Sequence, residues 1–293
     1  MRGYRKGLAC AAAVVVVLLA GAVVFSQAGP GSADPPGAGG QGGTSQEGRG
    51  SSDDPFRIAD GYVRTRRGVV TAAAEDLRTG QTWTLGSGAP QPEASVVKLD
   101  ILQALLARSP GGLPAAQRSL AQKMITVSDN DAATALWNAA DGAAGIGSYN
   151  TAAGLTRTRL SSCVRCPGFA WPGWGLSVTT PADQLALLRQ LVAPGTLLPP
   201  TARGYALSLL EKVTPSQRWG VSGGVPAGVT VALKNGWLPL NAADTDWQVN
   251  SAGWISGDGR DYLLVVLSTD DPSEQYGIAT VNHLGALAWS ALG

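Results

Sequence analysis

The order of strand-like and helix-like segments restricts the fold of this chain more than any other feature of its sequence. Two short strands near the start, 69–77 and 81–85, flank a turn at 78–80 that is typical of a hairpin. Helix-like segments fill the middle of the chain, and three further strands precede a closing helix over 273–292. This order predicts an α+β fold with one antiparallel sheet of about five strands, flanked by helices, whose first strands come from near the N-terminus.

The individual elements follow from apolar spacing and from end signals. Thr180 and Pro181 suit the N-cap and first turn of a helix. Residues 142–178 are weakly patterned, and no element is expected there. Helices are expected over 96–108, 115–126, 131–140, 181–191 and 205–212, and C-terminal strands over 229–233, 247–256 and 262–268.

The N-terminal region indicates export. Basic residues precede an apolar stretch over 8–25, and small residues follow it, so residues 1–28 are expected to be a signal peptide. The apolar stretch is also long enough for an uncleaved membrane anchor, which stays open. Residues 29–56 are rich in Gly, Pro and Ser and predict a flexible linker, which leaves 57–293 as the folded domain. The protein is therefore expected to be secreted or held at the cell envelope.

Composition excludes several classes of partner and cofactor. With 22 basic and 21 acidic residues among 293, the net charge of +1 gives no electrostatic case for nucleic acid, and membrane contact is expected only through the N-terminus. A single histidine and two cysteines in one loop make no zinc site, so no metal or other cofactor is expected. Cys163 and Cys166 are expected to form a local disulfide in an exported chain, because the surrounding loop lacks the strand-to-helix context of a thioredoxin-like site.

The first candidate catalytic group is Ser95-Val96-Val97-Lys98. A serine at the start of a helix and a lysine three positions later share one helix face. Burial and the positive end of the helix both lower a lysine pKa, so a neutral Lys98 amine can take the proton of Ser95. By itself the motif is weak evidence for catalysis, because a serine N-cap beside a solvated lysine is a common alternative.

Two further polar groups follow in the chain. In Ser128-Asp129-Asn130 the hydroxyl can relay a proton and the Asn130 amide can hold a substrate amide, although such a cluster also caps helices. Lys234-Asn235-Gly236 is expected at the end of an apolar strand, where Lys234 can bind a carboxylate and Gly236 can let substrate approach the strand. The alternative is a strand that ends in a turn with a solvated lysine.

The three motifs, in this order, resemble S-x-x-K, S-D-N and K-T-G of the class A β-lactamases and penicillin-binding proteins. Segments 179–183 and 218–220 and the run 247–268 resemble the same family, and the likeness covers about 65–293. The resemblance implies a sheet beside a mostly helical subdomain. It further implies that Ser95 is the nucleophile and Lys98 its base. Ser128 would be the proton relay and Lys234 the carboxylate anchor. The backbone N–H groups of Ser95 and Trp237 would form the oxyanion hole.

The sequence departs from this family at three places. Only 33 positions separate Ser95 from Ser128, which predicts a more open cleft. Asn235 stands where Thr or Ser is usual, and an amide can still donate to a carboxylate. Class A enzymes hydrolyse the acyl-enzyme with a loop glutamate, whereas residues 142–182 contain no Asp or Glu. Acylation is therefore expected to be faster than deacylation, and efficient β-lactam turnover is doubtful.

Three functions remain open from the sequence. The first is a serine hydrolase that forms an acyl-enzyme with β-lactams or related envelope peptides, amides or esters. The second is a β-lactamase with a non-standard deacylation group, and the third is a non-catalytic penicillin-binding or sensing module. A rival nucleophile elbow at 220–224, with His283 after it, lacks the strand before and the helix after that such an elbow needs.

The tryptophans divide into two groups. Those in expected strands or helices are expected in the core, and those near the presumed cleft fit packing or substrate binding equally well. The core group is Trp83, Trp137, Trp247 and Trp289, and the cleft group is Trp171, Trp174 and Trp237.

Overall fold

The computed structural model describes residues 54–292. The expected signal peptide, 1–28, and nearly all of the expected linker lie outside the described residues. The first helix, α1 (Phe56–Val63), begins one residue before the domain start expected at 57, and the Phe56 ring is buried in the core. Phe56 therefore belongs to the folded part of the chain and not to the linker.

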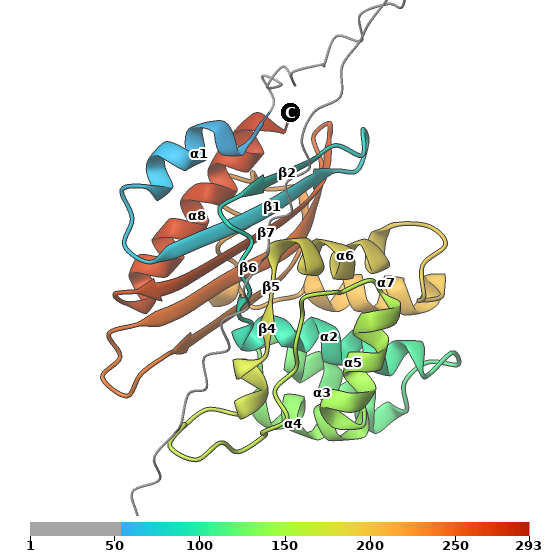
Figure 1. Ribbon diagram of the computed structural model, residues 1–293. Helices are drawn as coiled ribbons and strands as arrows, with labels where there is room; N and C mark the ends of the chain where they lie inside the picture. The colour runs from blue at the N-terminus through green and yellow to red at the C-terminus, as the bar shows by residue number, and fades with distance from the viewer. Residues whose placement is uncertain (1–53, 293) are drawn as a thin grey trace, which may run out of the picture. The chain divides into compact units, whose positions relative to one another are not determined.

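A five-stranded antiparallel sheet forms the centre of the molecule and confirms the α+β prediction (Figure 1). The N-terminal hairpin pairs with the last strand along the register Val69↔Thr269 to Asp76↔Tyr262, so the two ends of the domain share one sheet. Across the sheet the strands are β2 (Thr82–Leu85), β1 (Val69–Asp76), β7 (Arg260–Asp271), β6 (Trp247–Gly257) and β5 (Thr230–Pro239).

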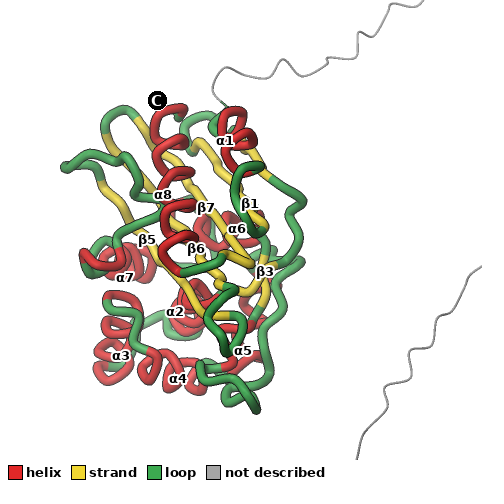
Figure 2. Tube along the Cα trace, turned by 90° about the vertical axis from the view of Figure 1, so that its left-hand side faces the viewer, coloured by secondary structure: helices red, strands yellow, loops and turns green. Residues whose placement is uncertain are grey.

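Helices cover both faces of this sheet (Figures 1 and 2). On one face lie α1 and α8 (Glu274–Ala291), and on the other lies α6 (Pro181–Val192), whose first turn is capped by Thr180 as expected. Beyond α6 a helical subdomain contains α2 (Lys98–Ala107), α3 (Ala115–Thr126), α4 (Asn130–Ala139), α5 (Gly142–Ala152) and α7 (Pro200–Leu210).

Helix α2 forms the centre of the helical subdomain. Every residue from Lys98 to Leu106 is buried, because α3, α4, α5 and α7 surround it. A helix that is buried all round must pair its polar groups inside the protein. The single turn η1 (Ala94–Val97) leads into α2 and packs against β5, so the start of this helix lies where sheet and subdomain meet.

Several expected elements need correction. Helix α5 falls in the stretch without an expected element, because its Gly and Ala residues give almost no amphipathic pattern. Helix α7 begins at Pro200 and not at 205. Strand β5 continues to Pro239, so Lys234-Asn235-Gly236 lies inside the strand and not at its end. The short pair β3 (Gln91–Pro92) and β4 (Val178–Thr179) was not expected either.

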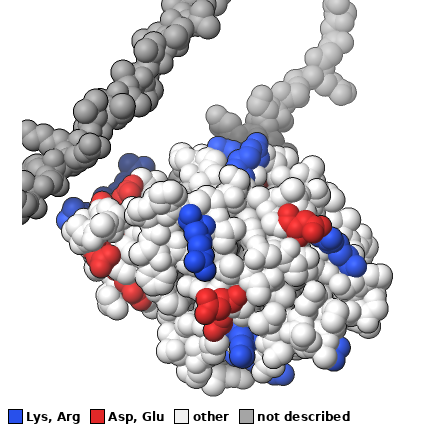
Figure 3. Space-filling model, turned by 90° about the horizontal axis from the view of Figure 1, so that it is seen from below, with Lys and Arg blue, Asp and Glu red and all other residues white. Residues whose placement is uncertain are grey.

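The surface carries mixed charge. On the face drawn in Figure 3, acidic and basic side chains are scattered among uncharged ones and form no patch of one sign. Within residues 54–292, no helix is long and apolar enough to cross a membrane. The same residues contain no group of three or more His, Cys, Asp or Glu side chains placed to hold a metal ion.

Candidate active site

The backbone presents Ser95 on the strained turn η1. Ala94, directly before it, has φ 50°, a left-handed conformation that a residue with a Cβ rarely adopts. Gly236 of β5 lies against this turn: a Cβ on Gly236 would be 2.6 Å from the Ser95 N and 2.7 Å from the Val96 N. The glycine therefore lets the strand and the Ser95 turn come into close contact. The approach of substrate expected at Gly236 stays a prediction.

Lys98 lies beneath Ser95 and is fully buried. Its Nζ is 3.0 Å from Ser95 Oγ, 2.9 Å from Ser128 Oγ and 2.8 Å from Asn130 Oδ1. The backbone carbonyl of Ser128 is a fourth neighbour at 2.6 Å. An ammonium has three hydrogens for these four oxygens, whereas a neutral amine can accept the Ser95 proton with its lone pair.

A second lysine approaches the same hydroxyl from the sheet. Lys234 Nζ lies 3.1 Å from Ser128 Oγ and 2.6 Å from the Asn235 carbonyl oxygen, and the side chain is fully buried. Ser128 has φ 58°, and this conformation brings both its hydroxyl and its carbonyl oxygen to Lys98. Ser128 Oγ thus lies within hydrogen-bond distance of two amines.

Burial lowers the pKa of both amines. It holds the pKa of Lys98 well below its usual value, and the charge of nearby Lys234 lowers it further, while the carboxylate of Asp129 acts weakly in the opposite direction. Burial lowers the pKa of Lys234 to about 7. No salt bridge involves either lysine within residues 54–292. Burial, one of the two causes expected to lower the Lys98 pKa, is therefore present. The second contribution comes from Lys234, whereas the positive end of the helix was expected.

The two asparagines of the motifs face different ways. Asn130 Oδ1 accepts from Lys98, and Asn130 also lines the cavity beside Ser95. Its expected contact with a substrate amide stays a prediction. Asn235 is fully buried and donates from Nδ2 to the carbonyl oxygens of Gln217, at 2.8 Å, and Trp219, at 2.9 Å. Both N–H groups of the Asn235 amide are therefore bonded inside the protein. Asn235 has no free N–H left to donate to a substrate carboxylate, contrary to the expectation from the sequence.

A cavity of about 190 Å³ opens beside Ser95. Trp171, Trp174 and Trp237 all line it, so the tryptophans expected near the cleft do lie there. The Trp174 indole is held by its Nε1–H bond to Thr134 Oγ1, at 3.1 Å, and the Trp237 and Trp219 rings pack in a T-shaped arrangement with centroids 5.7 Å apart. The remaining lining residues are Ala94, Val127, Ser128, Asn130, Pro172, Gly175, Gln217 and Leu238.

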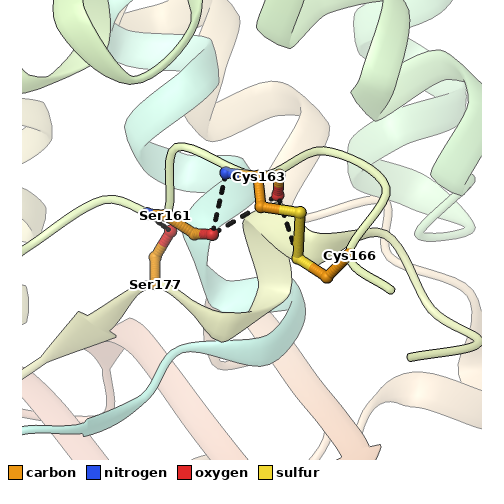
Figure 4. Close-up of a disulfide and its surroundings, with 4 residues drawn as sticks. All are labelled: Ser161, Cys163, Cys166 and Ser177. Atoms are coloured by element: carbon orange, nitrogen blue, oxygen red, sulfur yellow. Dashed lines mark hydrogen bonds between the residues drawn. A yellow bond between two sulfur atoms is a disulfide. The ribbon is translucent and has the colours of Figure 1, made fainter. Parts of the chain in front are cut away.

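The expected disulfide between Cys163 and Cys166 is present and fixes the loop that carries two of these tryptophans (Figure 4). The two Cα atoms are 5.5 Å apart, within the usual range for a disulfide. Gly173 packs against it, since a Cβ there would collide with the Cys163 carbonyl and the Cys166 sulfur. The Ser177 hydroxyl donates to the Trp174 carbonyl oxygen at 2.7 Å and ties the other end of the loop.

Sequence reasoning missed a buried acidic pair behind the nucleophile. Glu93, two positions before Ser95, and Asp100, on α2, are both fully buried. Asp100 Oδ1 accepts from Asn150, whereas Asp100 Oδ2 and both Glu93 carboxyl oxygens have no donor among the described residues. Burial and the neighbouring Asp100 raise the pKa of Glu93 well above its usual value, and burial raises that of Asp100 to about 7. A proton shared by the pair supplies the missing donor.

The rival serine does not form a nucleophile elbow. Ser222 lies in a turn, and its hydroxyl donates to the Arg218 carbonyl oxygen at 3.0 Å. The His283 ring, on α8, packs against the Tyr62 ring with centroids 4.0 Å apart. Neither a strand before Ser222 nor a helix after it is present in this part of the described chain, so the α/β-hydrolase alternative has no structural basis.

The fold and the site together define the class of protein as a serine β-lactamase-like protein, and comparison with known proteins agrees. The structure is similar to a β-lactamase from Chitinophaga pinensis DSM 2588, with TM-score 0.72 and 22% identity over 82% of this chain and 99% of that one. It is also similar to the TLA-1 extended-spectrum β-lactamase, with TM-score 0.73 and 16% identity over 82% and 99%. PBP-A matches with TM-score 0.68 and 19% identity over 81% and 95%. No curated protein sequence matches the chain.

The sequence itself identifies the family. The model of the β-lactamase enzyme family matches residues 108–292, more than half of the chain. The chain therefore belongs to the β-lactamase enzyme family. This match begins after Ser95 and Lys98, so the assignment does not depend on the first motif.

Proposed function

We propose that this protein is an exported serine hydrolase that forms an acyl-enzyme on Ser95. The observation that carries the proposal is the position of one buried amine, Lys98 Nζ, within 3.0 Å of both Ser95 Oγ and Ser128 Oγ. A base between a nucleophile and a proton relay is the arrangement that acyl transfer needs. The substrates are β-lactams or related amides and esters of the cell envelope.

In the acylation step, the neutral Lys98 amine takes the proton of the Ser95 hydroxyl while Oγ bonds to the substrate carbonyl carbon. The resulting oxyanion is held by the N–H groups of Ser95 and Trp237, which the contact between Gly236 and η1 brings together. When the bond to the leaving nitrogen or oxygen breaks, Ser128 gives its hydroxyl proton to the leaving atom and regains one from Lys98. The products are an acyl-Ser95 ester and a protonated leaving group, with Lys98 neutral again.

Hydrolysis of this ester is the slower half of the cycle. It requires a base near a water molecule beside the acyl carbon. No Asp or Glu lines the cavity in the described part of the chain, and the loop from Cys163 to Trp174 carries tryptophans and a disulfide there. The acyl-enzyme is therefore expected to accumulate.

Intact-mass spectrometry tests the proposal with two probes, benzylpenicillin and an activated neutral ester such as a 4-nitrophenyl ester. We expect one acyl adduct per chain with at least one probe, absent in Ser95→Ala, and slow loss of that adduct after the probe is removed. Ser222→Ala, at the rejected elbow, is the matched control and should keep the adduct. The proposal fails if neither probe gives an adduct or turnover that depends on Ser95.

A further inference from the structure

The strained residue Ala94 follows two peptide groups that one side chain of the sheet holds in place. The carbonyl oxygen of Glu93 belongs to the peptide group directly before Ala94, and that of Pro92 belongs to the one before it. Asn250, on β6, donates from Nδ2 to the Pro92 oxygen at 2.8 Å and to the Glu93 oxygen at 3.0 Å. An amide nitrogen has two hydrogens, so Asn250 uses both of them here. It therefore fixes the orientation of the backbone that leads into the left-handed residue.

Gly236 contacts the other side of the same turn. Gly236 and Asn250 lie opposite each other in the register of β5 and β6, so both positions face the same side of the sheet. A Cβ on Gly236 would meet the Ser95 N and the Val96 N, which belong to the peptide groups after Ala94. The sheet thus contacts the chain both before and after Ala94. A left-handed residue with a Cβ persists only where its surroundings hold it, and Asn250 contributes hydrogen bonds to that hold.

A chain of buried amides orients Asn250. Gln248, two positions earlier on the same face of β6, donates from Nε2 to Asn250 Oδ1 at 2.6 Å and to Gln91 Oε1 at 3.2 Å. Gln91 donates from Nε2 to the Val69 carbonyl oxygen at 3.2 Å and to Thr71 Oγ1 at 3.3 Å, both on β1. Gln248 and Asn250 are fully buried, and Gln91 is 3% exposed. Each of the three amide nitrogens uses both hydrogens inside the protein, so the chain fixes Asn250 relative to β1 and β6.

Asn250 affects the reaction through Ser95 and not through the substrate. It is fully buried and is not one of the described residues that line the cavity. The turn that it holds carries Ser95 Oγ, 3.0 Å from Lys98 Nζ, and the Ser95 N–H group proposed for the oxyanion. A misplacement of about 1 Å can slow a reaction about 100-fold.

We infer that Asn250 is a positioning residue for acylation: its two hydrogen bonds hold the η1 turn in the strained conformation that directs Ser95 Oγ to Lys98. Gln248 and Gln91 support it as the buried chain between Asn250 and β1. The inference rests on the proposed acylation of Ser95 and adds a residue that makes no contact with the reacting atoms.

Asn250→Ala is the first test. The space that it leaves adjoins the Pro92 and Glu93 oxygens and Gln248 Nε2, three polar partners for a water molecule, so the variant should fold. A mobile water should not hold the turn as firmly. With the probe that acylates the wild-type protein, benzylpenicillin or the 4-nitrophenyl ester, we expect a rate constant at saturation about 10- to 100-fold lower. The probe concentration for half this rate should change by less than about 3-fold, since the cavity lining is unchanged.

Ala94→Gly distinguishes positioning from a merely structural role. Glycine adopts a positive φ without steric cost, so the turn should depend less on Asn250 in this background. The loss in rate constant caused by Asn250→Ala should be at least about 3-fold smaller with Ala94→Gly than without it. Equal losses in the two backgrounds would contradict the inference.

Val281→Ala is the control for lost stability, since Val281 is fully buried on α8, on the other face of the sheet. It should lower the urea midpoint and keep the wild-type rate constant. A wild-type rate constant in Asn250→Ala would overturn the inference and leave the proposed function intact. If Asn250→Ala does not fold, Gln248→Met decides: it removes the donor that orients Asn250 and should slow acylation about 3- to 10-fold, and an unchanged rate constant overturns the inference. If neither probe acylates the wild-type chain at Ser95, the proposed function and the inference fail together.

Discussion

The amine of Lys98 and the hydroxyl of Ser95 lie 3.0 Å apart, and no carboxylate forms a salt bridge with that amine within residues 54–292. A lysine in such a place loses its proton more easily than one in water, because burial disfavours the ammonium. Lys98 Nζ is therefore close enough to Ser95 Oγ to take its proton, and its lowered pKa makes the neutral amine available to do so. It also makes the first half of the reaction dependent on pH in a direction that can be stated.

The rate of acylation should rise with pH. The folded-state pKa of Lys98 lies well below 10.5, so the neutral base forms at a lower pH than in an ordinary lysine. We expect the rate to increase about tenfold per pH unit below that pKa and then to level off. Single-turnover adduct formation, followed by mass spectrometry between pH 5 and pH 9, measures it.

Lys98→Arg is the informative variant for this prediction. Arginine keeps the positive charge but does not lose its proton in proteins, so acylation should fall by roughly 10²- to 10⁴-fold and lose its rise with pH. Lys123→Arg, on the exposed side of α3, is the control. A wild-type rate that does not change with pH, or an active Lys98→Arg protein, would exclude Lys98 as the base.

Gly236→Ala should damage the nucleophile turn. The added Cβ would meet the Ser95 N at 2.6 Å, the Val96 N at 2.7 Å and the Glu93 carbonyl oxygen at 3.0 Å, and all three are backbone atoms that cannot rotate away. We expect a loss of about 1–3 kcal/mol in the free energy of unfolding from overpacking, together with about 100-fold slower acylation. Urea unfolding and single-turnover kinetics measure the two effects.

Gly204→Ala provides the matched control, because a Cβ at this position in α7 meets no atom within 4 Å. Alanine in a helix interior should stabilise that variant by about 0.5–1 kcal/mol. If Gly236→Ala acylates at the wild-type rate, the strand does not position the Ser95 turn.

The sequence predicts the parts of this molecule that depend on local spacing. Helix α3 and the pairing of Ser95 with Lys98 both follow from helical periodicity, and the structure contains them. The convergence of Ser128 and Lys234 on that pair depends on contacts between distant segments. It was expected only through the resemblance to a known family.

The missed features share one physical reason: each depends on neighbours that are far away in the sequence. From its position in the first turn of a helix, Asp100 would be expected at the surface. In the structure it is fully buried, and Asn150 of α5 donates a hydrogen bond to its carboxylate. Asn235 suits a substrate donor, yet the carbonyl oxygens of Gln217 and Trp219 take both of its N–H groups. Polar residues inside a core give no apolar pattern from which their partners could be inferred.

The buried pair Glu93 and Asp100 should make the protein less stable as pH rises from about 4 to about 7. The folded-state pKa of Asp100, about 7, lies above its ordinary value of 3.8, so the folded state holds its proton more tightly than the unfolded state. Stability from this proton is fully present below about pH 4 and is lost as pH rises to about 7. Glu93, whose pKa is also raised, acts in the same direction.

Asp100→Asn should remove much of this loss, on the order of 2 kcal/mol, because an amide does not ionise and its oxygen still accepts from Asn150. Urea unfolding at pH 4, 5.5 and 7 gives the comparison. Asp258→Asn, whose side chain is 67% exposed, should keep the wild-type pH dependence. An Asp100→Asn protein that loses as much stability as the wild type would refute the shared-proton interpretation.

Removal of the disulfide should make the loop that carries Trp171 and Trp174, the aromatic wall of the cavity, more mobile without unfolding the domain. The Cys163–Cys166 bond closes a very short ring, for which the chain-entropy estimate is about 2 kcal/mol, and Gly173 packs directly on it. In Cys163→Ser/Cys166→Ser we expect faster backbone hydrogen exchange over 161–177, with protection in the central strand β7 kept. Acylation by an aromatic ester should slow about 3- to 10-fold, since Trp171 and Trp174 lose their fixed positions. Equal exchange in this loop with and without the disulfide would show that the bonds of Ser177 and Thr134 to Trp174 suffice to hold the wall.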